Sequence, residues 1–222
     1  MAAPTGLERT FPNLLTNEGV LNLEYDKWDQ QGVPPEHELT VPFTRMLAGP
    51  LDFHQGSLRG VPLGEFRPRN AAPLVVGTPC RMLATYVVFQ NHLPMVADYP
   101  SAYRGHPALP VLSTIPTTWD ETRCLAGKVG ELIVITRRQG PRWWVGAMGG
   151  REAREVEIPL DFLGPGRFRA ETYRDDLNSA TRLARRVEDV ARVQVLRIPL
   201  APAGGLLIRL SPVSDDPKAS GR

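Results

Sequence analysis

The second half of the chain repeats a pattern of short apolar runs separated by turn residues. From about Thr117 onward, β-branched and aromatic residues gather in short runs, and clusters such as Gln139-Gly140-Pro141 and Gly164-Pro165-Gly166 divide them. This pattern predicts an antiparallel β-sandwich over residues 117–211. The expected strands are Glu131 to Thr136, Arg142 to Met148, Arg154 to Pro159, Arg167 to Tyr173, Val193 to Pro199 and Gly204 to Leu210.

Two stretches of this half do not follow the strand pattern. Residues 180–191 are compatible with a helix, and we expect a long connection between two strands there. Residues 212–222 are polar, so we expect them to form a flexible tail.

The first half is richer in loops. Apolar runs at Phe11 to Leu15 and at Leu39 to Leu47 are separated by Gly, Pro and charged residues, which suits the ends of barrel strands and the long loops that follow them. One helix is predicted from about Pro79 to His92, because Thr78 is a suitable N-cap and apolar residues follow at helical spacing. We expect Pro94 to end or kink this helix.

Length, composition and charge narrow the class of protein. At 222 residues and 42% hydrophobic content, the chain can bury one sizeable core or two small ones. The formal net charge is +2, and no basic stripe is interleaved with aromatics, so we expect no nucleic-acid partner. No apolar run approaches the roughly 20 residues of a membrane span, so we expect no membrane insertion. Cys80 and Cys124 lie far apart in sequence, and we expect both to be small buried hydrophobes.

The candidate chemistry lies near the start of the chain, on a polar segment that contains two carboxylates, a glycine and aromatic residues. Glu18 and Glu24 both fall in this segment, and further acids and a histidine follow in turn-like sequences. The informative segments are Arg9 to Trp28, Pro34-Pro35-Glu36-His37, Val41 to Phe53 and Thr117-Thr118-Trp119-Asp120-Glu121-Thr122-Arg123. Together they resemble glycoside hydrolase family 97, whose members cleave α-glucosides or α-galactosides, and the resemblance runs from about Pro4 to Leu210.

The resemblance implies an α+β fold with two parts. Residues 1–116 would be the C-terminal part of a (β/α)8 catalytic barrel, so that an incomplete barrel remnant is followed by the antiparallel β-sandwich. Family members carry an N-terminal β-sandwich and most of the barrel before this point, so we expect the chain to be a C-terminal piece of a longer enzyme. For that full-length enzyme the resemblance implies a periplasmic or secreted location.

Glu24 falls at the position of the general acid in this family. Glycoside hydrolysis needs one protonated carboxylic acid for the leaving oxygen and a second carboxylate that attacks the sugar or activates water. Leu23, Tyr25 and Trp28 could lower the polarity around Glu24, which favours the neutral form of a carboxyl group. From spacing alone Glu24 would be a solvated surface acid, and the resemblance favours the catalytic role. The family commonly has Arg-Gly where this chain has Leu21-Asn22.

Other positions take weaker roles from the resemblance. Glu18 corresponds to a glutamate that helps to bind Ca²⁺ beside the substrate, and Glu24 could add one more ligand, with the rest supplied by upstream segments. The alternative for Glu18 is a carboxylate that caps local backbone donors. Asp52 and His37 are candidate substrate-binding residues, although a turn-capping role for Asp52 and a structural turn around His37 are equally compatible.

Three tryptophans and two acids of the second half invite a functional interpretation. Trp119, Trp143 and Trp144 could stack on sugars, but core positions are commoner in a sandwich, and Trp143 and Trp144 should point to opposite sides of their strand. Asp120 and Glu121 are expected at an interface or a strand edge.

The sequence thus predicts an α-glycosidase that acts on an oligosaccharide or glycoside and assembles as a homo-oligomer through its C-terminal domain. The second catalytic carboxylate lies upstream in the family, so the choice between retention and inversion stays open, and the isolated chain is expected to be weakly active or inactive. The alternative is a non-catalytic module that binds carbohydrate or mediates assembly.

Overall fold

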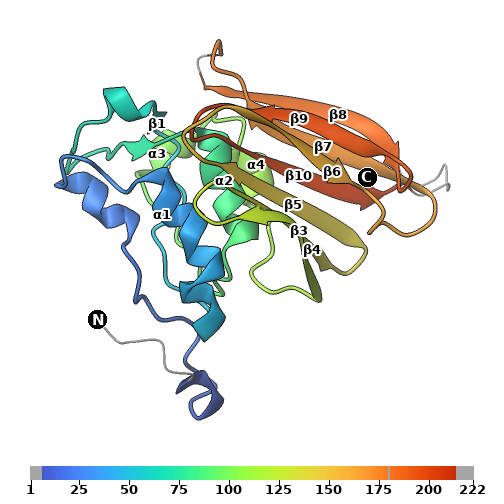
Figure 1. Cartoon of the computed structure of the whole chain (residues 1–222), viewed down its shortest axis with the longest axis horizontal. Coiled ribbons are helices and arrows are strands. Elements are labelled where there is room, and N and C mark those ends of the chain that lie inside the picture. The colour runs from blue at the N-terminus through green and yellow to red at the C-terminus, as the bar shows by residue number, and fades with distance from the viewer. Residues whose placement is uncertain (1–6, 180, 214–222) are drawn as a thin grey trace.

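A six-stranded antiparallel sheet organises the molecule (Figure 1). The computed structural model describes residues 7–179 and 181–213. The strand order in this sheet is β3-β4-β5-β10-β7-β8, and every neighbouring pair is antiparallel. Its strands are β3 (Glu121–Lys128), β4 (Leu132–Gln139), β5 (Arg142–Gly149), β7 (Arg167–Asp175), β8 (Leu183–Ala191) and β10 (Gly205–Pro212).

A two-stranded sheet covers one face of the large sheet and completes the predicted sandwich. It consists of β6 (Arg154–Pro159) and β9 (Val195–Leu200). Both strands alternate buried and exposed residues, because their outer face meets solvent. Val156, Ile158 and Ile198 point from them into a core that also contains Val145 and Ile208 of the large sheet.

The helix α2 (Pro79–Val88) covers the other face of the large sheet, and all its residues are buried. A Cβ at Gly146 would lie 2.8 Å from the Ala84 carbonyl oxygen, and one at Gly205 would lie 2.5 Å from the Arg81 Cα. Glycine at both strand positions therefore lets the helix backbone approach the sheet closely. Since both faces of β5 are covered, residues 143–149 are all buried.

The burial of the tryptophans is explained by the coverage of both faces of the large sheet. Trp143 faces the sandwich core and Trp144 faces the α2 side, so the predicted alternation is correct, although both side chains are buried. Trp119 packs edge-on against Trp144, with ring centroids 6.5 Å apart. Asp120 and Glu121 lie at the edge strand, where both pair with Arg138.

The first 116 residues contribute short elements joined by loops. Asn17 forms a parallel bridge with Leu51, and the Leu51 N–H donates to the Gln90 carbonyl at 2.9 Å, so three extended segments lie side by side. The barrel origin of these segments stays a prediction. The elements are η1 (Leu7–Arg9), η2 (Leu23–Lys27), α1 (Pro35–Thr40), η3 (Val41–Phe43), η4 (Arg45–Ala48), β1 (Gly60–Val61), η5 (Leu63–Glu65), β2 (Val75–Val76), α3 (Pro100–Tyr103) and α4 (Leu109–Leu112), with β1 and β2 paired in parallel.

A buried arginine joins this part to the large sheet. Arg81 on α2 forms an ion pair with Glu38 of α1, with an Nε to Oε2 distance of 2.7 Å, and both side chains are almost completely buried. Its other nitrogens donate to the carbonyls of Gly149 at 2.5 Å and Pro35 at 2.8 Å. One side chain thus connects α1, α2 and the end of β5.

Three sequence predictions need correction. The helix expected to reach His92 ends at Val88, because Gln90 continues in the extended segment beside Leu51. The stretch expected to be a connection forms β8 from Leu183, while Ala180 lies outside the described residues. Cys80 is buried as expected, but Cys124 on the edge strand is exposed.

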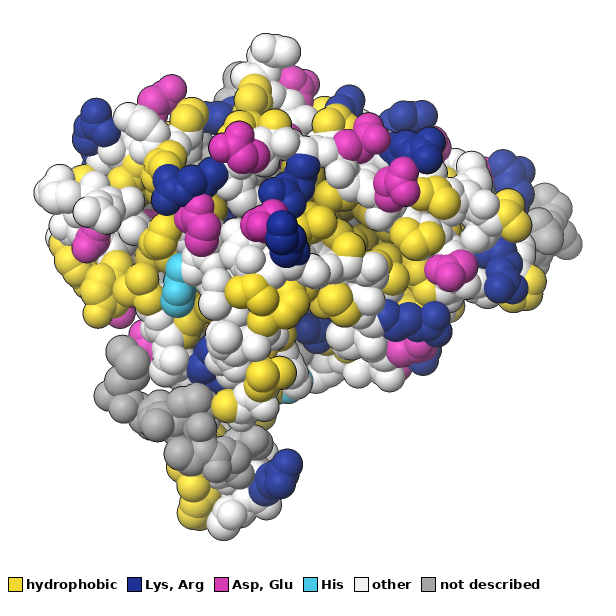
Figure 2. Space-filling view, viewed as in Figure 1, with side chains coloured by type: hydrophobic (Ala, Val, Ile, Leu, Met, Phe, Trp, Pro, Cys, Tyr) yellow, Lys and Arg dark blue, Asp and Glu magenta, His cyan; other side chains and the backbone are white. Residues whose placement is uncertain are grey.

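Two further expectations concern the ends of the chain and the membrane. β10 extends to Pro212, and residues 214–222 lie outside the described part. None of the described helices has the length and apolar character needed to cross a bilayer. Acidic and basic side chains are interspersed over the face shown in Figure 2, in keeping with the small net charge.

Candidate active-site cleft

The loop that carries Glu18 and Glu24 is organised around a fully buried asparagine. The Asn22 Oδ1 accepts from the backbone N–H of Leu23 at 2.9 Å and of His54 at 2.6 Å. Its Nδ2 lies 3.5 Å from the Glu18 Oε1 and 3.4 Å from the Asp52 carbonyl oxygen. Asn22 also caps the short helix η2, on which Glu24 is the second residue. The buried amide therefore fixes both the Glu24 turn and the segment that begins at Asp52.

The buried guanidinium of Arg45 holds the strand that leads into this loop. It donates to the carbonyls of Asn17 at 2.5 Å and Glu18 at 2.9 Å. It also donates to the carbonyls of Gly49 at 3.0 Å and Pro50 at 3.1 Å. Because these carbonyls belong to two separate segments, Arg45 sets the position of the Glu18 backbone relative to the segment that precedes Asp52.

Glu24 lies in the wall of a surface cleft with a volume of about 310 Å³. This volume is at the lower end of the range for small-molecule sites, roughly 300–1,000 Å³. Glu24 itself is partly buried, and the apolar Leu23 lies beside it. The ring of Tyr25 contacts that of Trp28, with centroids 5.4 Å apart, and Trp28 is largely exposed. The cleft is lined by Leu23, Glu24, Lys27, His54, Ser57, Asn70, Ala72, Pro73, Val75, Met95, Ala97, Asp98 and Tyr99.

A second carboxyl group on the same turn is buried beneath the surface. The Asp26 Oδ1 accepts from the Val33 N–H at 2.7 Å and so closes the loop between η2 and α1. Burial is the main cause that raises the pKa of Asp26 to about 7, and the nearby Glu38 and Asp29 add to the shift. Asp26 does not line the cleft, so we assign it the role of holding the loop.

His37 and Asp52 support the site rather than line the cleft. The His37 Nε2 donates to the Leu21 carbonyl at 2.9 Å, which ties α1 to the loop before Glu24. Asp52 contributes backbone atoms, since its N–H donates to the Asn17 carbonyl at 2.9 Å and its carbonyl accepts from Asn22. The roles of His37 and Asp52 in substrate binding stay predictions.

The described residues do not form a calcium site by themselves. Within residues 7–179 and 181–213, no group of three or more His, Cys, Asp or Glu side chains could hold a metal ion. Ca²⁺ takes about six to eight oxygen ligands. Glu18 and Glu24 could supply part of such a set only if oxygen donors from outside the described residues complete it.

Sequence reasoning missed most of the cleft. His54, Ser57 and the residues around Tyr99 line it, but they follow no motif and come from loops far apart in the sequence. Asn22 was noted only as a departure from the family pattern. Its position directly before η2, as an N-cap residue, is the signal that could have indicated its role.

Comparison with known proteins identifies the relationship. Residues 118–211 match the family model described as "Glycosyl-hydrolase 97 C-terminal, oligomerisation". The chain is related to glycoside hydrolase family 97. The "Retaining alpha-galactosidase" of Bacteroides thetaiotaomicron is 38% identical over 213 residues, which are 93% of this chain and 32% of that protein. The "Probable retaining alpha-galactosidase" of Streptomyces bingchenggensis is 31% identical over 91% of this chain and 29% of its own length.

Solved structures of family 97 show the same fold. An enzyme of this family from Pseudoalteromonas sp. strain K8, in complex with acarbose, superposes with a TM-score of 0.83 and 36% sequence identity. The match covers 94% of this chain and 33% of the Pseudoalteromonas chain. A β-arabinopyranosidase matches with a TM-score of 0.71 and 25% identity over 87% of this chain. The likeness to family 97 covers the first half as well as the C-terminal domain, and the chain spans about a third of the curated relatives that it matches.

Proposed function

We propose that this chain forms the proton-donor side of the active site of an α-glycosidase, with Glu24 as the general acid. The observation that carries the proposal is the position of Glu24, partly buried in a cleft on a turn that the buried Asn22 holds in place. α-Galactosides are the preferred substrates, because the two curated relatives described above are named α-galactosidases and match more than nine tenths of the chain.

The chemistry follows from the general requirement for two carboxyl groups. Glu24 protonates the oxygen of the leaving group, while a carboxylate from outside this chain acts on the anomeric carbon. Retention of configuration is the expected outcome, in line with the names of the two relatives, and it requires the two carboxyl groups to lie about 5–5.5 Å apart. Asn22 caps the turn that carries Glu24, and a donor that is already positioned lowers the entropic cost of reaching the transition state.

We limit the proposed calcium role to Glu18 as a partial ligand, because Ca²⁺ holds a bound carboxyl group in its ionised form and Glu24 must be protonated to act as the general acid. When bound, Ca²⁺ would supply a fixed positive charge beside the sugar. The Asn22 Nδ2 faces the Glu18 carboxylate at a distance of 3.5 Å from its Oε1.

Turnover tests the proposal. The chain spans about a third of the Bacteroides relative, so it is fused to the remaining two thirds of that enzyme. Hydrolysis of methyl α-galactoside and methyl α-glucoside is then measured, because departure of an alkoxide leaving group depends on the proton donor. We expect the galactoside to be cleaved faster, and Glu24→Gln to lower the rate by about 10²–10⁴. The matched control Glu65→Gln, at an exposed position of η5, should leave the rate unchanged.

A fusion that is active but insensitive to Glu24→Gln would contradict the assignment. An inactive fusion, combined with galactoside binding by the 222-residue chain alone, would favour a carbohydrate-binding module instead.

A second role for residues 118–211 is self-association. We infer it from the description of the matching family domain, and from exposed apolar residues around β8 and β9, among them Val187, Val193 and Val195. Sedimentation velocity should show an assembly larger than one chain, and Val193→Asp with Val195→Asp should shift it to the monomer. A monomeric wild-type chain at micromolar concentration would refute this role.

A further inference from the structure

The cleft beside Glu24 has a second wall that no sequence motif indicates. Met95, Ala97, Asp98 and Tyr99 form it, within an irregular segment that follows the extended residues near Gln90. The side chain of Tyr99 is 56% exposed and that of Met95 is 41% exposed. Tyr99 and Met95, both well exposed, therefore line the same cleft as Glu24, the proposed proton donor.

Buried hydroxyls hold this segment in place although it forms no helix or strand. The Tyr86 Oη of α2 donates to the Met95 carbonyl at 2.7 Å. The Tyr103 Oη lies 2.5 Å from the Ala97 carbonyl oxygen and 2.7 Å from the Gly56 carbonyl oxygen, so its single proton is shared between them. The Ala97 N–H donates to the Gln55 carbonyl at 2.8 Å. These hydrogen bonds attach the carbonyls of Met95 and Ala97 to neighbouring elements, so the backbone that carries the exposed side chains of the segment is held in place.

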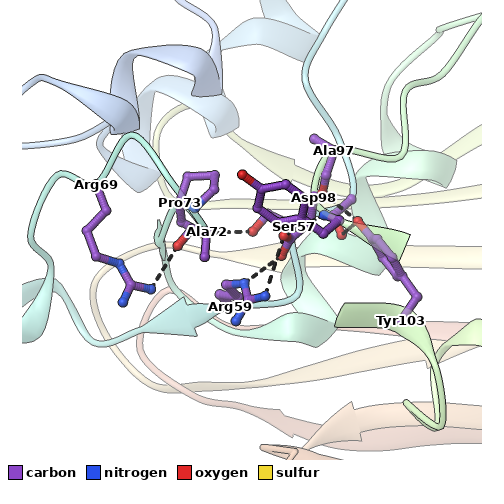
Figure 3. Close-up of polar contacts among 10 residues, drawn as sticks. Ser57, Arg59, Arg69, Ala72, Pro73, Ala97, Asp98 and Tyr103 are labelled. Atoms are coloured by element: carbon purple, nitrogen blue, oxygen red, sulfur yellow. Dashed lines mark hydrogen bonds and ion pairs between the residues drawn. The ribbon is translucent and has the colours of Figure 1, made fainter. Parts of the chain in front are cut away.

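Asp98 fixes the backbone at Tyr99 through an unfavourable conformation. Its φ is 134°, a region that residues other than glycine rarely adopt. The buried carboxylate of Asp98 forms an ion pair with the Arg59 Nε at 2.7 Å and accepts a hydrogen bond from the Tyr99 backbone N–H at 2.7 Å. Figure 3 shows Arg59 and Asp98 facing each other.

Ala72 and Pro73, which also line the cleft, are held by the same combination of positive φ and side-chain hydrogen bonds to the backbone. Ala72 has a φ of 49°, and its carbonyl accepts from the Arg69 guanidinium at 2.8 Å. The Ser57 hydroxyl donates to the Pro73 carbonyl at 3.2 Å (Figure 3). Two of the residues with unfavourable positive φ therefore line this one cleft, and backbone strain that is held by several contacts is typical of binding sites.

The position of Glu24 determines which part of a substrate meets this wall. A general acid protonates the glycosidic oxygen, so the leaving group must lie against it. The second carboxylate acts on the sugar from outside this chain, whereas the wall with Met95 and Tyr99 belongs to the same cleft as the proton donor. Flat aromatic rings offer a large apolar contact surface with a polar tip, which suits both aryl groups and the apolar face of a sugar.

We propose that Tyr99, with Met95 beside it, is the platform that binds the leaving-group half of an α-glycoside. The inference rests on the function proposed above and names the residues that set its preference for the leaving group. Aryl groups and a further sugar ring are the ligands that this surface favours over small alkyl groups.

Binding to the 222-residue chain tests the platform. Dissociation constants for galactose, methyl α-galactoside and p-nitrophenyl α-galactoside are measured by ligand-observed NMR titration. We expect the aryl galactoside to bind the wild-type chain roughly three- to tenfold more tightly than the methyl galactoside, as a ring contact of ordinary strength provides. Tyr99→Ala should remove this ratio, while Tyr99→Phe should keep it.

Val96→Ala is the matched control. Val96 lies in the same segment and is 52% exposed, but it does not line the cleft, so the ratio should not change. Equal affinities of the wild-type chain for the methyl and aryl galactosides would overturn the platform proposal alone, as would a ratio that survives Tyr99→Ala. Absence of binding for all three ligands would count against the proposed sugar site as well.

Discussion

Replacement of Asn22 by alanine tests whether one buried amide holds the loop of the proposed general acid. The change leaves the N–H groups of Leu23 and His54 without their acceptor, which lies at 2.9 and 2.6 Å in the folded chain. A buried donor without a partner costs about 1–3 kcal/mol. The loss of the acceptor for both donors should therefore lower the free energy of unfolding by roughly 2–6 kcal/mol. The longer contacts to Glu18 and Asp52, at 3.5 and 3.4 Å, should add little.

Urea unfolding followed by tryptophan fluorescence measures this loss. Asn22→Asp keeps an acceptor oxygen but places a carboxylate next to that of Glu18, so we expect an intermediate loss. Asn13→Ala, at an exposed position of the same loop-rich region, serves as the control and should change stability by less than about 0.5 kcal/mol. A loss below about 1 kcal/mol for Asn22→Ala would refute the role of Asn22 as the support of this loop.

Three further changes probe other parts of the structure. Arg81→Ala leaves the buried Glu38 carboxylate unpaired and should destabilise the chain by about 3–5 kcal/mol in chemical denaturation. Arg81→Met combined with Glu38→Leu removes the unpaired charge and should recover part of the loss, because the carbonyls of Gly149 and Pro35 still lack their donor. Equal instability of both variants would contradict this account. The pKa of Asp26 is raised from 3.8 to about 7 in the folded chain. Its neutral form therefore contributes stability that is complete below about pH 4 and is lost as pH rises through 7. Asp26→Asn, which can still accept from Val33, should remove up to roughly 4 kcal/mol of this fall in the free energy of unfolding, and an unchanged pH profile of stability would count against it. Gly205→Ala places a Cβ 2.5 Å from the helix backbone and should lower the melting temperature strongly, while a melting temperature within a few degrees of wild type would show that the helix can move away from the sheet.

Much of the sandwich could be predicted from the sequence because its strands carry their own signals. β6 was predicted with its observed bounds, since one of its faces is solvent and apolar residues alternate with charged ones. β8 was missed because the exposed Arg185, Arg186 and Val187 interrupt any alternation, and its pairing with β7 decides its conformation. A helical pattern in such a stretch is a local preference that the neighbouring strand overrides.

The site could be predicted only where the family resemblance identified it. Glu24 was chosen on that ground, and the structure places it in a cleft. Tyr99 and Asp98 could not be found, because they lie in an irregular loop far from Glu24 in the sequence, and only the fold brings them to the same cleft. Positive φ at a non-glycine residue has no sequence signal that a single chain reveals.

The dependence of hydrolysis on the leaving group tests the central claim most directly. The fusion described above is assayed with methyl and dinitrophenyl α-galactosides, since only the poor methoxide leaving group needs a proton. We predict that Glu24→Gln lowers kcat/KM for the methyl galactoside by about 10²–10⁴ and leaves kcat/KM for the dinitrophenyl galactoside within a few fold. Equal losses for both substrates would contradict the assignment of Glu24 as the proton donor.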